Sequence, residues 1–390
     1  MRVELIYRNY KPLHKAYESL VNNPPRGVEY VVSPTKARLQ KFYPLYKRLR
    51  YFAPTRNLIR LVEQVIFTKA SNQDEPVDLY QYINLIDERR PDRPYVVDTE
   101  HAAGLISFAP DHKRVKKVID FLQPEQCVGI SCWSQAAQKS LKNLTGSSYS
   151  KFSKKVEVIY PALPSYAKLY PKADFSIIPK NNKLKVLFVG NQAYLKGLEE
   201  LLKATEELNE KFGPDRLAIY VVSDDGAEVV QKYALPNVEL FAPKFSKQDV
   251  ITKLYMPADV FVMPTKQDTF GLALLDALSC GTAAIATKQF AAAELIEDGV
   301  DGCLLDLDNP MMDTVLVPQK ADTERVAKPS LDQKLADQIV SVITNILDGR
   351  LDIKKMGQNG VKKFQPGGKF SVSTRNKKLL EVYDHSNPKR

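Results

Sequence analysis

The stretch from 255 to 302 constrains the fold more than any other part of the chain. It begins with an apolar, β-rich run, Ala258 to Met263, turns at Pro264, and continues with residues typical of a buried helix and a further strand. A strand, a polar loop, a helix and a second strand in this order predict one step of a parallel sheet with crossover helices. In such sheets ligands bind beyond the carboxyl ends of the strands.

Two acids stand in this stretch eight positions apart, Asp268 before the predicted helix and Asp276 within it. Asp276 is the one charged side chain between Gly271 and Ala286. A carboxylate in such apolar surroundings costs several kcal/mol unless hydrogen-bond donors or an opposite charge accompany it. A vicinal diol is a suitable ligand, because two adjacent hydroxyls can donate to one carboxylate.

The residues between the acids predict an anion site. The backbone N–H groups of Phe270, Gly271 and Leu272 are expected to open the helix, where unsatisfied amides attract phosphate. Gly271 has no Cβ, so a ligand can approach its backbone closely. A sugar site beside a phosphate site matches a nucleotide-sugar.

Structural alternatives exist for both acids. Asp268 can serve only as the helix N-cap, paired with Lys266, which is the commoner role of an Asp before a helix. Asp276 can point to solvent on an edge of the helix. The eight-residue spacing favours the functional interpretation of the pair.

The stretch resembles the signature of retaining glycosyltransferases of the GT-B fold, family four. In that family a proline is followed by an acid, Phe-Gly-Leu and a second acid, and both acids are usually glutamates where this chain has Asp268 and Asp276. The tail also resembles the family, with Gly281, the apolar run AAIAT and the turn AELIEDGVDG.

The resemblance implies an α/β chain with two doubly wound parallel-sheet, Rossmann-like domains that face a cleft. We expect an acceptor-side domain over 1–165, a linker over 166–183, a nucleotide-sugar domain over 184–366, and a C-terminal helix over 367–390 that crosses back. The implied reaction is metal-independent transfer of a hexosyl group from a nucleotide-sugar to a glycan, a lipid or a lipid-linked saccharide, with retention and without a cofactor.

The resemblance also assigns the phosphate contacts. The family has an arginine directly after a strand-ending glycine and a lysine further on, and both contact the donor diphosphate. Gly190 and Lys196 match the glycine and the lysine, while Asn191 occupies the place of the arginine. An asparagine can donate a hydrogen bond to phosphate, but it carries no charge and no bidentate fork. The alternative for Lys196 is an exposed loop lysine.

Three further roles follow from the resemblance. His101, at the end of the strand in PYVVDTEH, corresponds to a histidine that faces the donor sugar, and a structural hydrogen-bonding role is the alternative. Asp268 is expected to hold sugar hydroxyls and Asp276 the ribose. His101 and Asp268 are thus the candidate catalytic residues.

Other functions remain open. Asn191 and the shorter acids allow a non-catalytic or weakly active relative that binds a sugar nucleotide or a partner protein. A sugar-nucleotide epimerase on the same fold is a second rival, and the acid, Phe-Gly-Leu, acid run argues against it. A membrane-associated scaffold is a third.

The basic segment between Lys36 and Arg60 supports that third rival. The net charge of the 390-residue chain is +10, and this segment contains basic and aromatic residues but no acid. Through Lys47, Arg48 and Arg50 it can contact an anionic membrane or the acceptor, or it can simply be a solvated face. No nucleic-acid recognition motif accompanies it.

No transmembrane run and no signal-peptide core occur in the sequence, so we expect a cytoplasmic protein, with peripheral attachment to the inner membrane face as an extension. The four cysteines lack metal-ligand spacing and are expected to be buried free thiols.

Overall fold

The computed structural model describes residues 1–7, 13–32, 76–87, 91–106, 112–308 and 330–385. The chain forms two compact units: Met1–Ala162 with Ser373–Arg390, and Leu163–Val372. Each unit is built on a six-stranded sheet in which every pair of neighbours is parallel. The two units are described separately below.

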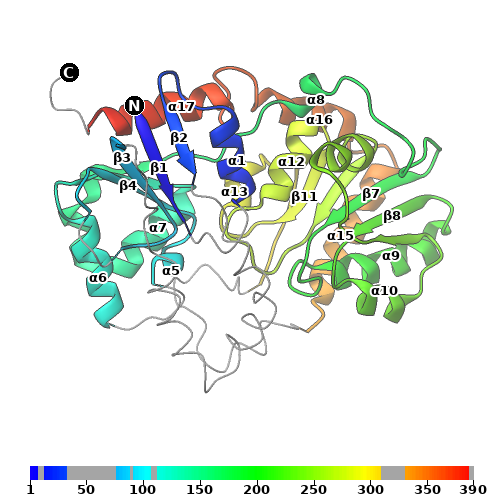
Figure 1. Ribbon diagram of the computed structural model, residues 1–390. Coiled ribbons are helices and arrows are strands. Elements are labelled where there is room, and N and C mark those ends of the chain that lie inside the picture. Colours follow the sequence, from blue (N-terminus) through cyan, green and yellow to red (C-terminus); the bar gives the residue numbers. More distant parts are fainter. Residues whose placement is uncertain (8–12, 33–75, 88–90, 107–111, 309–329, 386–390) are drawn as a thin grey trace. The chain divides into compact units, whose positions relative to one another are not determined.

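The sheet of the first unit has the order β2-β1-β3-β4-β5-β6 (Figure 1). Its winding reverses between β1 and β3, which makes the sheet doubly wound. The strands are β1 (Arg2–Ile6), β2 (Glu29–Val32), β3 (Leu79–Ile83), β4 (Tyr95–Thr99), β5 (Cys127–Cys132) and β6 (Val156–Val158).

Helices connect and cover these strands. They are α1 (Lys15–Asn22), α5 (Ala102–Leu105), α6 (His112–Leu122), α7 (Gln135–Thr145), the 3-10 turns η1 (Gly146–Lys151) and η2 (Ser153–Lys155), and α17 (Val372–Asp384). Helix α17 is fixed to the first unit by polar contacts. Arg375 donates to the carbonyl of Asn23 at 2.6 Å, and the Tyr383 hydroxyl donates to Gln81 at 2.5 Å.

The sheet of the second unit has the order β12-β11-β10-β7-β8-β9, so its winding reverses between β7 and β10. The strands are β7 (Leu184–Val189), β8 (Leu217–Val222), β9 (Val238–Phe241), β10 (Val260–Met263), β11 (Ala283–Thr287) and β12 (Gly302–Leu305). The predicted step of strand, loop, helix and strand corresponds to β10, the following loop, α12 and β11.

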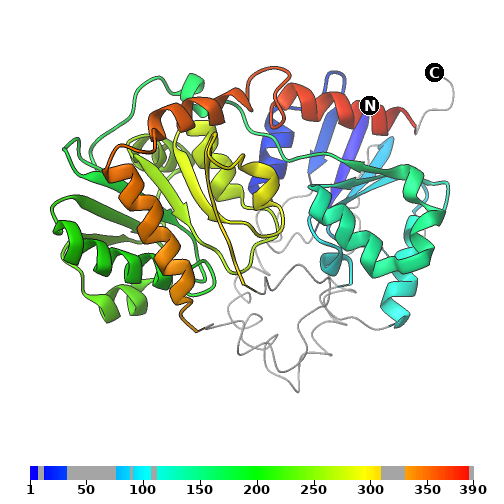
Figure 2. The ribbon, with the colours of Figure 1, turned by 180° about the vertical axis from the view of Figure 1, so that it is seen from behind.

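The helices of the second unit are α8 (Tyr166–Leu169), α9 (Leu198–Phe212), α10 (Ala227–Tyr233), α11 (Lys247–Asp249), the π-helix η3 (Val250–Tyr255), α12 (Leu272–Cys280), α13 (Ala292–Leu295), α15 (Gln333–Leu347) and α16 (Ile353–Lys362). Helices α9 and α15 lie side by side (Figure 2) and share an apolar core with alternate residues of the strands, including Val260 and Val262. Helix α12 packs on β10 and β11 and is buried along most of its length.

The predicted α/β class with two doubly wound parallel sheets is confirmed, since each unit contains one such sheet. Residues 166–183, predicted to be a linker, lie within the second compact unit, which begins at Leu163. There Ser279 Oγ accepts a hydrogen bond from the amide of Tyr166 at 3.1 Å. The same hydroxyl donates to the carbonyl of Pro164 at 2.9 Å. In the described ranges, no helix is long and apolar enough to cross a membrane.

Candidate active site

Two loops of the second unit follow neighbouring strands and are joined to each other. The β7–α9 loop comprises residues 190–197, and the β10–α12 loop comprises residues 264–271. The Lys266 amide donates to the carbonyl of Leu195 at 2.9 Å, and Thr265 Oγ1 donates to the same carbonyl at 3.3 Å. The loops therefore meet where the winding of the sheet reverses, the usual place for a ligand in an open parallel sheet.

Gly197 permits this close approach of the two loops. Its φ is +79°, and a Cβ at this position would lie 2.1 Å from the Pro264 carbonyl oxygen. Only glycine combines this backbone conformation with so short a distance to a neighbouring chain segment.

Lys196 and Asp268 form an ion pair across the two loops. Lys196 Nζ lies 2.7 Å from Asp268 Oδ2 and donates to the carbonyl of Gln267 at 3.2 Å. Their side chains are 17% and 22% exposed, so both remain accessible from solvent. The pairing of Asp268 with Lys266 considered from the sequence is wrong, because Lys266 pairs with Glu200.

Asp268 also shapes the start of the signature helix. Its Oδ1 accepts hydrogen bonds from the amide of Thr269 at 2.8 Å and, more weakly, from that of Phe270 at 3.4 Å. The N-cap of α12 is Gly271, with a φ of +93°. Asp268 is therefore not the helix N-cap; it closes an Asx turn in front of the helix.

The anion site predicted at this helix start has two open amides rather than three. The Phe270 amide is bonded to Asp268, whereas the amides of Gly271 and Leu272 donate to no acceptor in the part of the chain that is described. Helix amides without an acceptor carry partial positive charge. This position, beside Lys196 and Asp268 on the same pair of loops, suits a phosphate group.

Asp276 lies on α12 and is 9% exposed, so the solvent-edge alternative is wrong. Its neighbours are Tyr255 and Cys280. Burial raises the pKa of both groups well above the usual values, and the charge of Asp276 raises each further. Asp276 is therefore a buried carboxylate on a helix of otherwise mostly apolar residues.

Gly190 and Asn191 open the β7–α9 loop. The Gly190 amide donates to the carbonyl of Val222 at 3.0 Å and so continues the pairing of β7 with β8. Asn191 is exposed and forms a reciprocal pair with Asp224, with two hydrogen bonds of 3.0 Å. The position of the expected arginine thus holds an amide that is engaged with a carboxylate.

His101 lies in the first unit at the carboxyl end of β4. Its Nδ1 accepts a hydrogen bond from the Ala103 amide at 3.0 Å and caps α5, so the structural role considered for it is present. The ring is 4% exposed, and burial lowers the pKa of His101 to about 4. The imidazole is therefore neutral at pH 7, with its proton on Nε2.

Comparison with known proteins gives one consistent family. Residues 183–314, which include both loops, match the model for glycosyl transferases group 1. An uncharacterized glycosyltransferase of Methanocaldococcus jannaschii is 28% identical over 46% of this chain and 48% of that protein. A D-inositol 3-phosphate glycosyltransferase of Corynebacterium jeikeium is 29% identical over 34% of each protein. The chain thus matches about half of the length of one relative and a third of the other.

Solved structures match over nearly the whole chain. The Anabaena protein HepE, crystallised with UDP and glucose, has a TM-score of 0.59 at 16% identity and covers 98% of this chain and 99% of its own. Sucrose-phosphate synthase from Thermosynechococcus elongatus has a TM-score of 0.61 at 14% identity, with 98% of both chains covered. Residues 183–314 are thus similar to glycosyl transferases group 1. The solved structures show the same fold over nearly the whole chain.

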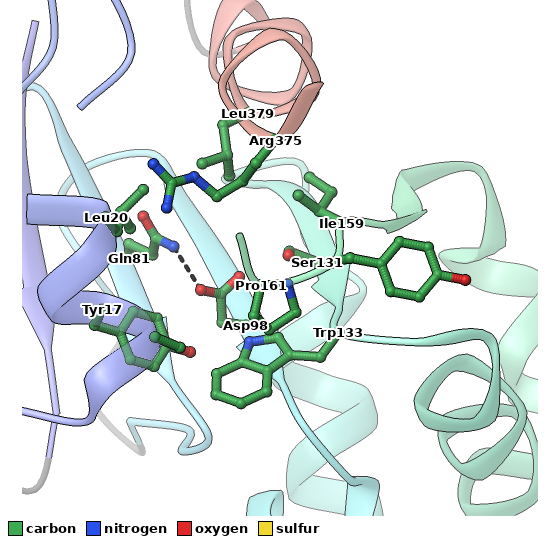
Figure 3. Close-up of a pocket in the computed structure, with 12 residues that line it drawn as sticks. Tyr17, Leu20, Gln81, Asp98, Ser131, Trp133, Ile159, Pro161, Arg375 and Leu379 are labelled. Atoms are coloured by element: carbon green, nitrogen blue, oxygen red, sulfur yellow. Dashed lines mark hydrogen bonds between the residues drawn. The ribbon is translucent and has the colours of Figure 1, made fainter. Parts of the chain in front are cut away.

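A small cavity in the first unit, lined by both polar and apolar side chains, was not predicted from the sequence (Figure 3). The cavity measures about 30 Å³, room for one water molecule. Asp98 faces it and accepts a hydrogen bond from Gln81 Nε2 at 2.6 Å. Burial raises the pKa of Asp98 to about 6, against the opposing effect of the polar side chains of Ser131, Gln81 and Tyr17 beside it. The signal in the sequence was an acid inside the apolar strand PYVVDT.

The remaining predicted site residues have other outcomes. Lys47, Arg48 and Arg50 lie outside the described residues. All four cysteines are buried free thiols, as predicted. Within the described ranges, no group of three or more His, Cys, Asp or Glu side chains could hold a metal ion.

Proposed function

We propose that this protein is a retaining glycosyltransferase that moves a sugar from a nucleotide-sugar to a glycan, a lipid or a lipid-linked saccharide. One observation carries the proposal. Lys196, Asp268 and the open amides of Gly271 and Leu272 lie on two hydrogen-bonded loops at the reversal point of the second sheet. This arrangement offers a cation and helix amides to a diphosphate, and a carboxylate to sugar hydroxyls.

In the proposed reaction the bond between the anomeric carbon and the phosphate oxygen breaks, and a bond to the acceptor hydroxyl oxygen forms. The acceptor proton passes to the leaving diphosphate, and no protein nucleophile is assigned. Lys196 and the amides at the start of α12 stabilise the diphosphate, where negative charge develops. Lys196 must therefore turn from Asp268 toward the phosphate when the donor binds, which leaves Asp268 to accept from sugar hydroxyls.

The other site residues complete the proposal. Asp276 binds the ribose hydroxyls. His101 contacts the sugar as a neutral hydrogen-bond donor through Nε2, since its low pKa excludes the imidazolium at pH 7. The Anabaena structural neighbour contains UDP and glucose, and the corynebacterial relative is named for D-inositol 3-phosphate. UDP-sugars and inositol 3-phosphate are accordingly the first donors and the first acceptor to test.

A second candidate function is a non-catalytic protein that binds a sugar nucleotide. Asn191 favours it, because the position of the arginine expected in the family holds an uncharged side chain that is paired with Asp224. Such a site has one cation, Lys196, where two are expected, and supplies less stabilisation to a leaving diphosphate.

Binding and turnover separate the two candidates. Thermal shift and sugar release are measured with a panel that includes UDP-glucose, UDP-N-acetylglucosamine and GDP-mannose, on the wild type and on Asp276→Ala. A shift with one donor that is lost in the variant, together with sugar release, supports the transferase. A shift without release or transfer supports the non-catalytic protein, and the absence of any shift contradicts both.

Peripheral membrane attachment through Lys47, Arg48 and Arg50 extends the proposal. Its test is sedimentation with vesicles that contain anionic lipid at low salt, for the wild type and for a variant with Arg48→Glu and Arg50→Glu. Equal sedimentation of both proteins would favour a merely solvated basic face.

A further inference from the structure

A buried ion pair lies behind the β10–α12 loop. Lys266 Nζ is 2.5 Å from Glu200 Oε1, and the two side chains are 7% and 0% exposed. Burial raises the pKa of Glu200, although Lys266 and the amide of Asp332 act in the opposite direction. Neither residue is among those matched to the family, although Lys266 lies within the signature stretch. Taking two charges out of water costs several kcal/mol per ion before their attraction is counted, so stability alone is a weak explanation for this pair.

The pair connects three segments of the second unit. Glu200 lies in the first turn of α9, directly after the β7–α9 loop, and Lys266 lies in the β10–α12 loop. Glu200 Oε1 also accepts from the amide of Asp332 at 2.9 Å, and Lys266 Nζ donates to the carbonyl of Ser330 at 3.1 Å. Both residues are thus attached at the point where the chain enters α15.

Lys266 holds its loop at two points. Its amide is bonded to the carbonyl of Leu195, and its ammonium group is bonded to Glu200. The next two residues supply the acceptors of Lys196, namely the Gln267 carbonyl at 3.2 Å and the Asp268 carboxylate at 2.7 Å. A displacement of Lys266 therefore moves both acceptors of the lysine that is assigned to the donor diphosphate.

Lys266 does not replace the arginine that is missing at position 191, because its side chain is buried and paired with Glu200. Its charge serves the loop and is not available to a ligand.

We propose that Glu200 and Lys266 are positioning residues of the donor site, which act through the backbone of Gln267 and Asp268 on the placement of Lys196. This inference rests on the proposed function of that site. The pair keeps the two acceptors of Lys196 in place, so that the ammonium group can pass from Asp268 to the diphosphate without rearrangement of the loop.

The chain offers a matched control. Lys185 Nζ lies 2.7 Å from Asp259 Oδ2, and this pair joins the amino ends of β7 and β10, whereas Lys266 and Glu200 lie beyond the carboxyl ends of the same strands. The Lys185 side chain is 9% exposed, close to the 7% of Lys266. Loss of either lysine leaves a carboxylate without its cation, but only Lys266 lies in one of the two loops of the proposed donor site.

The experiment compares Lys266→Met with Lys185→Met, using UDP-glucose and UDP as probes. Both variants should have a lower Tm. Only Lys266→Met should lower kcat/KM for UDP-glucose, by about 10- to 100-fold, through a higher KM or a lower kcat. Displacements near 1 Å have effects of this size. Lys266→Arg should restore part of the loss. Equal kinetic losses in both Met variants, or unchanged kinetics in Lys266→Met, would overturn the proposal.

The double variant Glu200→Met/Lys266→Met separates positioning from stability. Apolar replacement of both members of a buried pair often restores stability. We expect the Tm to recover while kcat/KM stays low, and recovery of both would contradict a positioning role. If the wild type binds no nucleotide-sugar of the panel, the proposed function fails, and hydrogen exchange then tests separately whether the pair holds the loop in place. Amides over 264–272 should then exchange faster in Lys266→Met than in Lys185→Met, and equal rates would overturn it.

Discussion

The reversal point of the second sheet and the carboxyl end of β4 in the first unit both gather ionisable residues, but they treat charge in opposite ways. In the second unit, Lys196 and Asp268 form an ion pair that solvent can reach. In the first unit, Asp98 and His101 are each 4% exposed, and burial moves the pKa of each group toward its neutral form.

The accessible pair can exchange its partners, whereas burial favours the uncharged forms of Asp98 and His101. A cation that must leave one carboxylate and bind a diphosphate has to avoid a large desolvation cost in both states, and partial exposure provides this. Asp98 is bonded to the side chain of Gln81, and His101 to the backbone amide of Ala103. For both buried groups the uncharged form has the lower desolvation cost. Parallel sheets of the same winding thus support two different uses of ionisable side chains.

The largest effect is expected from a substitution that breaks the Lys196–Asp268 pair. Lys196→Ala should reduce kcat/KM for the donor by about 10²- to 10³-fold, because it removes the charged donor to the developing diphosphate. The matched control is Lys203→Ala on α9, where Lys203 pairs with Glu206 at 2.8 Å on the same helix. Steady-state kinetics with the donor found in the panel provides the measurement. A loss below threefold in Lys196→Ala would remove this residue from the site.

Asp98 and His101 should each change how the free energy of unfolding depends on pH. Folded Asp98 has a pKa of about 6 against an ordinary 3.8, so its protonated form is favoured on folding and its contribution to stability falls as pH rises from about 4 to 6. Folded His101 has a pKa of about 4 against 6.5, so its contribution rises over nearly the same range. Shifts of this size correspond to about 3 kcal/mol for each group.

The two groups therefore change the free energy of unfolding with pH in opposite directions, and the changes largely cancel in the wild type. A variant that lacks one group should show the effect of the other. In Asp98→Asn the free energy of unfolding should rise relative to the wild type between pH 4 and 6.5. In His101→Asn, which keeps an acceptor for the Ala103 amide, it should fall. Urea unfolding at pH 4.5 and 6.5 measures both changes, and two variants that parallel the wild type would refute the proposed suppression of charge.

Gly197 tests whether the two donor loops depend on their close contact. Gly197→Ala places a Cβ 2.1 Å from the Pro264 carbonyl, and overpacking of this kind costs about 1–3 kcal/mol. Gly213→Ala is the control, since its φ of +81° is similar but nothing lies within 4 Å of the added Cβ. The difference in Tm between the two variants isolates the contact. Equal Tm values would show that the loops separate without cost.

The sequence predicted the strands and loops that carry the site because each is a local pattern. Asp268, Gly271 and Asp276 were found from their spacing around a short glycine-containing run, which is visible in one stretch of chain. The sequence did not predict the contacts of Asp268 with Lys196 and of Lys266 with Glu200, since each joins residues about 70 positions apart. Which lysine pairs with which acid depends on the register of neighbouring strands and cannot be derived from local spacing.

The cavity beside Asp98 was missed for the same reason. The acid was visible inside an apolar strand, but its neighbours Gln81, Tyr17 and Ser131 come from three other elements. Only the order of the sheet brings them together. An acid in an apolar strand is thus a signal of a buried polar site, while the composition of that site requires the structure.

The smallest expected effect distinguishes the two acids of the signature. Asp268→Asn should lower turnover more than it weakens binding of UDP, because Asp268 is assigned to the sugar. Asp276→Ala should weaken both UDP and nucleotide-sugar, because it is assigned to the ribose. A lost hydrogen bond to a charged group costs about 1.5 kcal/mol or more, equivalent to about a tenfold change. Calorimetric titration with UDP and UDP-glucose, beside initial rates, measures both; if Asp268→Asn weakened UDP as strongly as Asp276→Ala does, the division of roles between the exchangeable and the buried acid would be wrong.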